Sequence, residues 1–174
     1  MNIANKITLS RVALIPVFLV FLYADFKGSH IVAMIVFIIA ALTDIADGVI
    51  ARWTNQVTDF GKFMDPLADK ILVVAAMLWF VEQGVLPAWL ALIVIVREFM
   101  VTALRLVAID NGRVIAAAIS GKVKTVVTII CLSTLFVMTD AWIVYTCIGL
   151  ITATTLVSGV EYFVKNRDII KPDR

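Results

Sequence analysis

Long apolar stretches separated by short polar segments dominate this chain. Each stretch approaches the roughly 17–25 residues that an α-helix needs to cross a bilayer, although the third reaches that length only if its helix begins near Asp65. The pattern predicts an all-α, polytopic membrane protein with six transmembrane helices and both termini on one side. The six stretches are residues 12–26, 31–50, 67–81, 85–109, 114–138 and 141–164.

Composition supports the membrane interpretation. Hydrophobic residues make up 62% of the chain and charged residues 16%, and the mean hydropathy is +1.03. A soluble domain holds about 45–50% apolar and about 25% charged residues. At this length we expect a single membrane domain over residues 1–174. Just before the first apolar stretch, Asn5, Thr8 and Arg11 share one helical face. That stretch is therefore expected to begin as an N-terminal interfacial segment and to be retained rather than cleaved as a signal peptide.

Basic residues are unevenly distributed between the two ends of the predicted helices. The connections near 25–30, 82–86 and 139–140 hold only Lys27, whereas the opposite ends hold twelve lysines and arginines. Basic residues accumulate on the cytoplasmic side of membrane proteins. The sequence therefore predicts that both termini and the 52–64 connection are cytoplasmic. The twelve are Lys6, Arg11, Arg52, Lys62, Lys70, Arg113, Lys122, Lys124, Lys165, Arg167, Lys171 and Arg174.

Four aspartates lie in or beside two successive predicted helices. Asp44 and Asp47 fall near the end of the second, and Asp65 and Asp69 near the start of the third. Carboxylates at such positions are costly and usually functional. The short connection makes the two helices antiparallel neighbours, so their polar faces should meet at the cytoplasmic end. Positions 44, 47, 48 and 51 share one helical face, and positions 61, 65 and 69 share another.

Clustered carboxylates need cations to stay ionised, because like charges raise each other's pKa. Magnesium and similar hard metals prefer carboxylate, water and phosphate oxygens. Two such ions would bridge a diphosphate and stabilise the leaving phosphate. Gly48 and Ala51 would leave room for a nucleotide, and Arg52 would pair with a phosphate. The alternative is that the aspartates only cap helix ends. It suits Asp65 and Asp69 in early turns but not Asp44 and Asp47 near a C-terminus.

The residues match the pattern D-x2-D-G-x2-A-R-x8-G-x3-D-x3-D at all eight fixed positions. With this pattern the chain resembles the CDP-alcohol phosphatidyltransferase family, whose six-helix fold it also fits. The resemblance implies transfer of a phosphatidyl group from CDP-diacylglycerol to an alcohol, with release of CMP. The positions are Asp44, Asp47, Gly48, Ala51, Arg52, Gly61, Asp65 and Asp69.

The resemblance also implies a role for each of these residues. The four aspartates would hold two ions, Mg²⁺ or Mn²⁺, against the diphosphate of the substrate. Asp69 would also be the catalytic base that removes the proton of the acceptor hydroxyl. The small residues Gly48, Ala51 and Gly61, together with Arg52, would bind CDP. The family resemblance further implies a homodimer.

A second polar segment concerns the acceptor alcohol. Glu98, Thr102 and Arg105 form one helical stripe with Arg97 beside it, and Gly121-Lys122-Val-Lys124-Thr125 follows after the next connection. A charged stripe in a membrane helix should face a cavity rather than lipid. The segments resemble R-E-F-x-V-T-x-L-R and G-K-x-K-T of the family branch that makes phosphatidylglycerophosphate. In that branch the acceptor is sn-glycerol 3-phosphate. The candidate residues for its phosphate are Arg97, Arg105, Lys122 and Lys124.

Other functions remain open at this stage. Ala4 and Ala103 depart from residues frequent in that branch, which slightly weakens the assignment of the acceptor. Other family members use serine, inositol phosphate or another phosphatidyl lipid as acceptor, although the segment from Arg97 to Arg105 argues against a neutral one. A purely structural pairing of Arg97 and Arg105 with Glu98 is an alternative role for the cations. A membrane prenyltransferase would not need Gly48, Ala51 and Arg52. A divalent-cation transporter should carry polar groups through the midplane, whereas the outer halves of these helices are almost wholly apolar.

Overall fold

The protein is described from a computed structural model. The structure describes residues 3–54, 59–110, 115 and 118–167. Side chains are described for residues 13–43, 70–109, 115 and 118–167.

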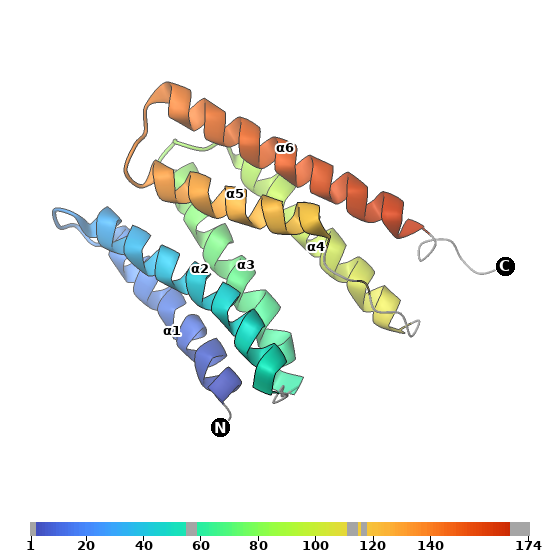
Figure 1. Cartoon of the computed structure of the whole chain (residues 1–174). Helices are drawn as coiled ribbons and strands as arrows, with labels where there is room; N and C mark the ends of the chain where they lie inside the picture. Colours follow the sequence, from blue (N-terminus) through green and yellow to red (C-terminus); the bar gives the residue numbers. More distant parts are fainter. Residues whose placement is uncertain (1–2, 55–58, 111–114, 116–117, 168–174) are drawn as a thin grey trace. The chain divides into compact units, whose positions relative to one another are not determined.

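Six α-helices and no strands form in the described residues, so the all-α prediction is confirmed (Figure 1). Each helix overlaps one apolar stretch of the sequence. The third begins well before Asp65 and so reaches a length that the apolar stretch alone did not guarantee. The helices are α1 (Ile3–Tyr23), α2 (Ser29–Thr54), α3 (Asp59–Glu82), α4 (Ala88–Asp110), α5 (Ile119–Leu135) and α6 (Ala141–Lys165).

The short connections contain residues suited to sharp turns. Gly28, before α2, has a φ of +94°, and Gly84, after α3, has a φ of +70°. Side chains rarely adopt this left-handed region, so glycine is favoured at both positions. Pro87 immediately precedes α4, and its carbonyl accepts a hydrogen bond from the backbone N–H of Leu90. Pro87 therefore marks the start of α4.

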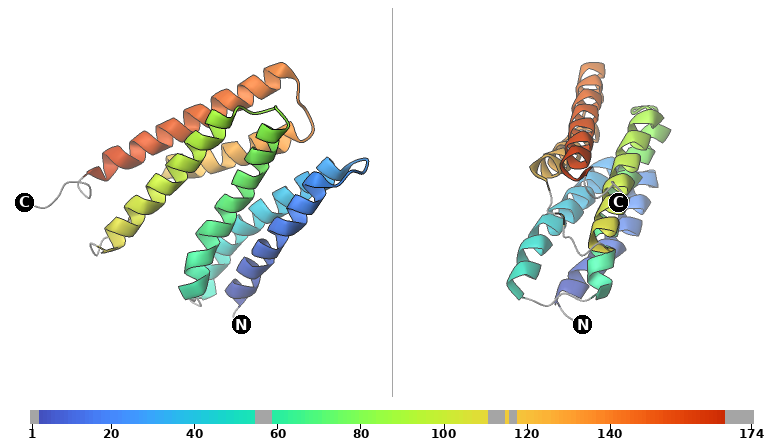
Figure 2. Two further views of the ribbon diagram at one scale, coloured as in Figure 1. Left: turned by 180° about the vertical axis from the view of Figure 1, so that it is seen from behind. Right: turned by 90° about the vertical axis from the view of Figure 1, so that its right-hand side faces the viewer.

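The chain divides into two compact units. The first consists of residues 1–79 and 133–138, and the second of residues 80–132 and 139–174. In the first unit α1 and α2 lie side by side in Figure 1 and in both views of Figure 2.

Aromatic side chains hold the first unit together. Phe18 of α1 and Phe37 of α2 have ring centroids 5.8 Å apart, and Phe136 lies 6.3 and 6.2 Å from them. Trp79 of α3 stacks on Phe136 at 5.7 Å and meets His30 of α2 at 5.0 Å. Such pairs contribute about 0.5–1.5 kcal/mol beyond simple burial. The His30–Trp79 contact joins the start of α2 to the end of α3, which confirms that these helices are antiparallel neighbours.

In the second unit α4, α5 and α6 pack through stripes of buried residues. The buried residues of α6 recur every three or four positions, which is the spacing of one helical face. The thiol of Cys147 on this face lies 3.9 Å from the carbonyl oxygen of Cys131 on α5. Both cysteines are free and buried, so they act as packing residues between α5 and α6. The buried face of α6 consists of Ile143, Cys147, Ile151, Thr155, Ser158 and Tyr162.

The outward-facing residues of the helices are largely apolar. In α4, for example, Phe99 is 70% exposed and Leu106 63% exposed. By length and composition α6 is the one helix in the described parts that could cross a membrane, with a mean hydropathy of 1.8. The apolar portions Ala13–Tyr23 and Ser29–Thr43 are shorter. These findings fit a membrane protein but do not establish six transmembrane spans.

Candidate active site

The aspartate pattern lies on the two antiparallel helices α2 and α3. The backbone is helical through both halves of the pattern, and only residues 55–58 separate Thr54 from Asp59. Five Cα–Cα steps reach at most about 19 Å, so the end of α2 and the start of α3 must be close. The side chains of all eight pattern residues, including Gly48, Ala51, Arg52 and Gly61, lie outside the described side chains.

The helix bounds bear on the alternative that the aspartates only cap helix ends. Asp65 lies in the second turn of α3 and Asp69 in the third, because α3 begins at Asp59. Asp44 and Asp47 lie ten and seven residues before the end of α2 at Thr54. The effect of a helix dipole falls off within the first or last turn. Capping therefore does not account for any of the four positions, and a cation-binding role gains support.

The carboxylate oxygens of the four aspartates are ligands that suit a hard divalent ion. Two carboxylates on each of two adjoining helices would supply an all-oxygen donor set of the type that magnesium prefers. Among the described side chains there is no other group of three or more histidine, cysteine, aspartate or glutamate residues that could hold a metal. The donor set of Asp44, Asp47, Asp65 and Asp69 thus fits the cofactor that the sequence implies.

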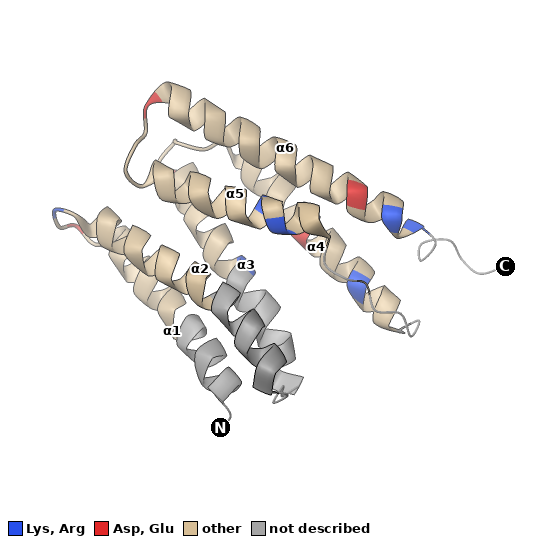
Figure 3. Cartoon of the chain, in the orientation of Figure 1, with Lys and Arg blue, Asp and Glu red and all other residues tan. Residues whose placement is uncertain are grey.

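The second polar region lies on the inward face of α4. The apolar part of this face includes Leu90, Val94, Val101 and Leu104, all buried. Arg97 and Glu98 fall between Val94 and Val101 in this inward series, and their side chains are only 12% and 17% exposed. These two residues of the charged segment therefore point inward rather than lying on the outer surface of α4. Figure 3 shows the charged positions of α4, α5 and α6.

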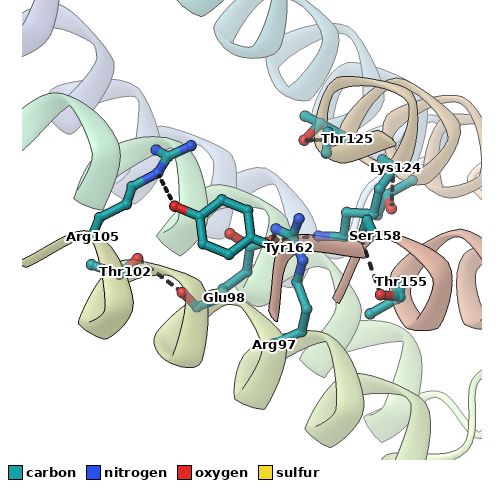
Figure 4. A network of polar contacts seen from close by, with 11 residues as sticks. Arg97, Glu98, Thr102, Arg105, Lys124, Thr125, Thr155, Ser158 and Tyr162 are labelled. Carbon is teal, nitrogen blue, oxygen red and sulfur yellow. Dashed lines mark hydrogen bonds and ion pairs between the residues drawn. The ribbon is translucent and has the colours of Figure 1, made fainter. Parts of the chain in front are cut away.

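Glu98 joins two cations from two helices. Its Oε1 atom accepts hydrogen bonds from Nη1 of Arg97 and Nζ of Lys124, both at 2.8 Å. The Lys124 side chain is 5% exposed, so it cannot rely on water to stabilise its charge. Removal of one member of a buried ion pair is strongly destabilising, because it leaves an uncompensated charge. The Glu98 carboxylate therefore fixes α5 against α4 (Figure 4).

Glycines allow the other helices to approach Arg97 closely. A Cβ atom on Gly121 of α5 would lie 3.2 Å from Nη2 of Arg97, and one on Gly159 of α6 would lie 3.5 Å from its Cγ. The Arg97 side chain thus lies against the backbone of both helices. Its Nε atom is buried and has no hydrogen-bond partner among the described residues.

Arg105 has a different environment from the other charged residues on α4. Its Nε–H donates a hydrogen bond to the hydroxyl oxygen of Tyr162 on α6, at 3.1 Å. The carbon of its guanidinium group lies 5.8 Å from the centroid of the Tyr162 ring. Arg105 is exposed, whereas Tyr162 is only 2% exposed. The buried Tyr162 side chain therefore orients the exposed guanidinium group of Arg105.

The structure distinguishes the four predicted acceptor residues. Arg97 and Lys124 converge on Glu98, and Arg105 is held by Tyr162. Lys122 is exposed on α5, two residues before Lys124 and therefore about 200° around the helix from it. It does not share the Lys124 face.

Tyr162 is a residue of this polar region that the sequence did not predict. It lies 57 positions from Arg105 and belongs to neither recognised segment. The four-residue spacing of Ser158 and Tyr162 on the buried face of α6 was the available signal. This spacing indicates that Tyr162 is buried, but it does not show which residue Tyr162 contacts.

Comparisons with known proteins agree with these features. Residues 1–160 match the CDP-alcohol phosphatidyltransferase family. The chain is 43% identical to the CDP-diacylglycerol–glycerol-3-phosphate 3-phosphatidyltransferase of Bacillus subtilis (strain 168), over 98% of this chain and 97% of that protein.

Two further relatives come from other bacteria. The protein of the same name from Escherichia coli (strain K12) is 38% identical over 92% of each chain. A probable phosphatidylglycerophosphate synthase of Mycobacterium tuberculosis (strain H37Rv) is 37% identical, over 97% of this chain and 83% of that protein. The match covers both the aspartate pattern and the Arg97–Lys124 region, and this chain belongs to the CDP-alcohol phosphatidyltransferase family.

Proposed function

We propose that the chain transfers the phosphatidyl group of CDP-diacylglycerol to sn-glycerol 3-phosphate, giving phosphatidylglycerophosphate and CMP. The main support for this proposal is the 43% identity, over nearly all of both chains, to a relative whose name states these substrates. The complete aspartate pattern on α2 and α3 supports the reaction class.

The proposed chemistry is direct attack of the acceptor alcohol. The hydroxyl oxygen of glycerol 3-phosphate bonds to the phosphorus that carries diacylglycerol, and the bond from that phosphorus to the CMP oxygen breaks. Asp69 takes the hydroxyl proton, so the nucleophile is activated as the bond forms. CMP leaves with the bridging oxygen and the electron pair of the broken bond.

The cofactor in this proposal is a pair of divalent cations, magnesium or manganese. Asp44, Asp47, Asp65 and Asp69 would hold them. When bound, they neutralise charge that develops on the diphosphate oxygens. The dual role of Asp69 as ligand and base is what membership of the family implies.

The CDP group would lie beside the same two helices. Gly48 and Ala51 follow Asp47 on the aspartate-bearing face of α2, and Gly61 begins the corresponding face of α3. Small residues at these positions leave space for a nucleotide. Arg52 would supply a cation for its phosphates.

The acceptor phosphate is assigned to the charged region of α4 and α5. Of its candidate residues, Arg105 and Lys122 are exposed. Arg97 and Lys124, with one carboxylate between them, leave a net charge of about +1 in a nearly buried setting and so favour an anion nearby.

The membrane arrangement is part of the proposal. Six spans would place both termini and the active site at the cytoplasmic face of a bacterial membrane, with residues at the start of α1 interfacial. Lys122, Lys124 and Lys165 lie at the charged ends of α5 and α6, whereas no charged residue follows Lys124 in α5 or precedes Glu161 in α6. This distribution supports the orientation. A single functional domain and a homodimer complete the proposal.

The test is CMP release by the purified protein with CDP-diacylglycerol and magnesium. Glycerol 3-phosphate, serine and inositol phosphate are compared as acceptors. We expect release with glycerol 3-phosphate only, with loss of activity on chelation and recovery on adding magnesium. Release with serine or inositol phosphate instead would keep the family and refute the proposed acceptor.

A further inference from the structure

The ring of Tyr162 has a fixed position in the second unit. It is 2% exposed and packs with Val101 and Leu104 of α4 in one core cluster. Ile115 and Phe163 pack against the same cluster. Because the ring is enclosed by these apolar side chains, its hydroxyl group is held at a defined place beside α4.

That hydroxyl group lies where it can orient Arg105. An exposed arginine samples many rotamers, and binding a ligand removes this freedom. The 3.1 Å hydrogen bond from Nε of Arg105, together with the 5.8 Å separation of guanidinium carbon and ring centroid, restricts the side chain before any ligand arrives. Preorganisation of this kind increases affinity without a new contact to the ligand.

The bond to Tyr162 also selects which edge of the guanidinium group is available. A guanidinium group binds a phosphate through two parallel N–H groups, using either its Nε edge or its Nη1–Nη2 edge. Tyr162 occupies the Nε position. In Figure 4 the two Nη atoms of Arg105 lie on the side away from the tyrosine.

Arg105 differs in this respect from the cations near Glu98. Nη1 of Arg97 and Nζ of Lys124 already donate to the Glu98 carboxylate. Both side chains are nearly buried, whereas Arg105 is exposed. The geometry therefore gives Arg105 the best access to a soluble anion of the three.

We propose that Tyr162 is a positioning residue for acceptor recognition, orienting Arg105 so that its Nη1–Nη2 edge binds the phosphate of glycerol 3-phosphate. This assignment rests on the proposed function of the chain. Tyr162 acts through Arg105 and contacts neither the acceptor hydroxyl nor CDP-diacylglycerol in this scheme. Its loss should therefore affect acceptor binding rather than the chemical step.

The test is Tyr162→Phe, which keeps the ring in the core and removes the hydroxyl group. At saturating CDP-diacylglycerol we expect the KM for glycerol 3-phosphate to rise about tenfold, equivalent to about 1.4 kcal/mol. The kcat and the KM for CDP-diacylglycerol should stay within about twofold of wild type. Tyr145→Phe is the matched control, because Tyr145 is 73% exposed on the same helix. It should leave all three constants unchanged.

A second measurement separates positioning from general structural damage. In an Arg105→Ala background, Tyr162→Phe should cause no further rise in the acceptor KM, because the residue it orients is gone. An unchanged acceptor KM in the single variant would overturn the proposal. So would equal changes in both KM values with a lowered melting temperature. Wild-type protein that releases no CMP with glycerol 3-phosphate would instead refute the proposed function, and this assignment with it.

Discussion

The aspartate region and the cationic region of this chain are built in opposite ways. The four aspartates belong to two successive helices, and their spacing of three or four residues is local to each helix. The cationic region draws on three helices, and its contacts join residues 26 and 57 positions apart. The first arrangement follows from helical periodicity alone. The second depends on how α4, α5 and α6 pack.

The difference concerns chemical role as well as construction. An all-carboxylate set requires external cations to be stable, so it points to a cofactor and to the reaction. In the cationic region, by contrast, Glu98 already compensates part of the charge within the protein. Such a region can both hold helices together and bind an anion. Substitutions should separate these two roles.

The largest effect is expected from Asp69→Asn in the aspartate region. The asparagine amide cannot remove the proton from the hydroxyl group of the acceptor alcohol, so turnover should fall by about 10³-fold or more. Binding of CDP-diacylglycerol, measured by equilibrium titration with magnesium present, should be largely retained. If binding is lost together with turnover, Asp69 serves mainly as a metal ligand and the proposed base is wrong.

In the cationic region, Glu98→Gln tests the structural role. The variant keeps the shape of the side chain but leaves Arg97 and Lys124 as neighbouring buried cations. We expect a loss of about 3 kcal/mol in the free energy of unfolding, measured by denaturation in detergent. Glu161→Gln is the control, because the Glu161–Lys165 ion pair is on the surface of α6. Equal stability of the two variants would show that the Glu98 bridge does not hold α4 and α5 together.

Arg105→Ala tests the binding role of the same region. Loss of charge-assisted hydrogen bonds should raise the KM for glycerol 3-phosphate about 10- to 100-fold, because such bonds contribute about 1.5–3 kcal/mol. The KM for CDP-diacylglycerol should change much less. Arg105→Lys should lie between, since it keeps the charge but not the planar fork. Equal effects on both substrates would contradict an acceptor role for Arg105.

The smallest effect concerns the close approach of α5 to Arg97. Alanine favours a helix over glycine by about 0.5–1 kcal/mol. Gly149→Ala should show that gain, because its Cβ would meet nothing within 4 Å. Gly121→Ala should not show this gain in stability, because the Arg97 guanidinium group must move away from a Cβ atom only 3.2 Å distant. Thermal melting of both variants measures the difference, and an equal gain would show that α5 has room to adjust.

The sequence predicted the features that depend on local periodicity. The apolar stretches predicted six helices. The short connection predicted that α2 and α3 are antiparallel neighbours, and the contact of His30 with Trp79 confirms this. The family followed from the spacing of eight residues. Whether Asp44, Asp47, Asp65 and Asp69 bind metal remains a prediction, since their side chains lie outside those described.

Contacts between distant helices could not be predicted in the same way. The two polar segments gave four equivalent cations, but they could not show that Lys124 shares the Glu98 carboxylate or that Arg105 contacts Tyr162. These pairings depend on the rotation and separation of packed helices. A pattern within one helix does not determine either quantity.

The most direct test of the central claim follows the acceptor into the product. Purified protein in lipid vesicles is given CDP-diacylglycerol, magnesium and isotopically labelled sn-glycerol 3-phosphate, and CMP and lipids are quantified by mass spectrometry. We predict one labelled phosphatidylglycerophosphate for each CMP released, and neither product after chelation of the metal. CMP release without label in the lipid fraction would contradict transfer to glycerol 3-phosphate.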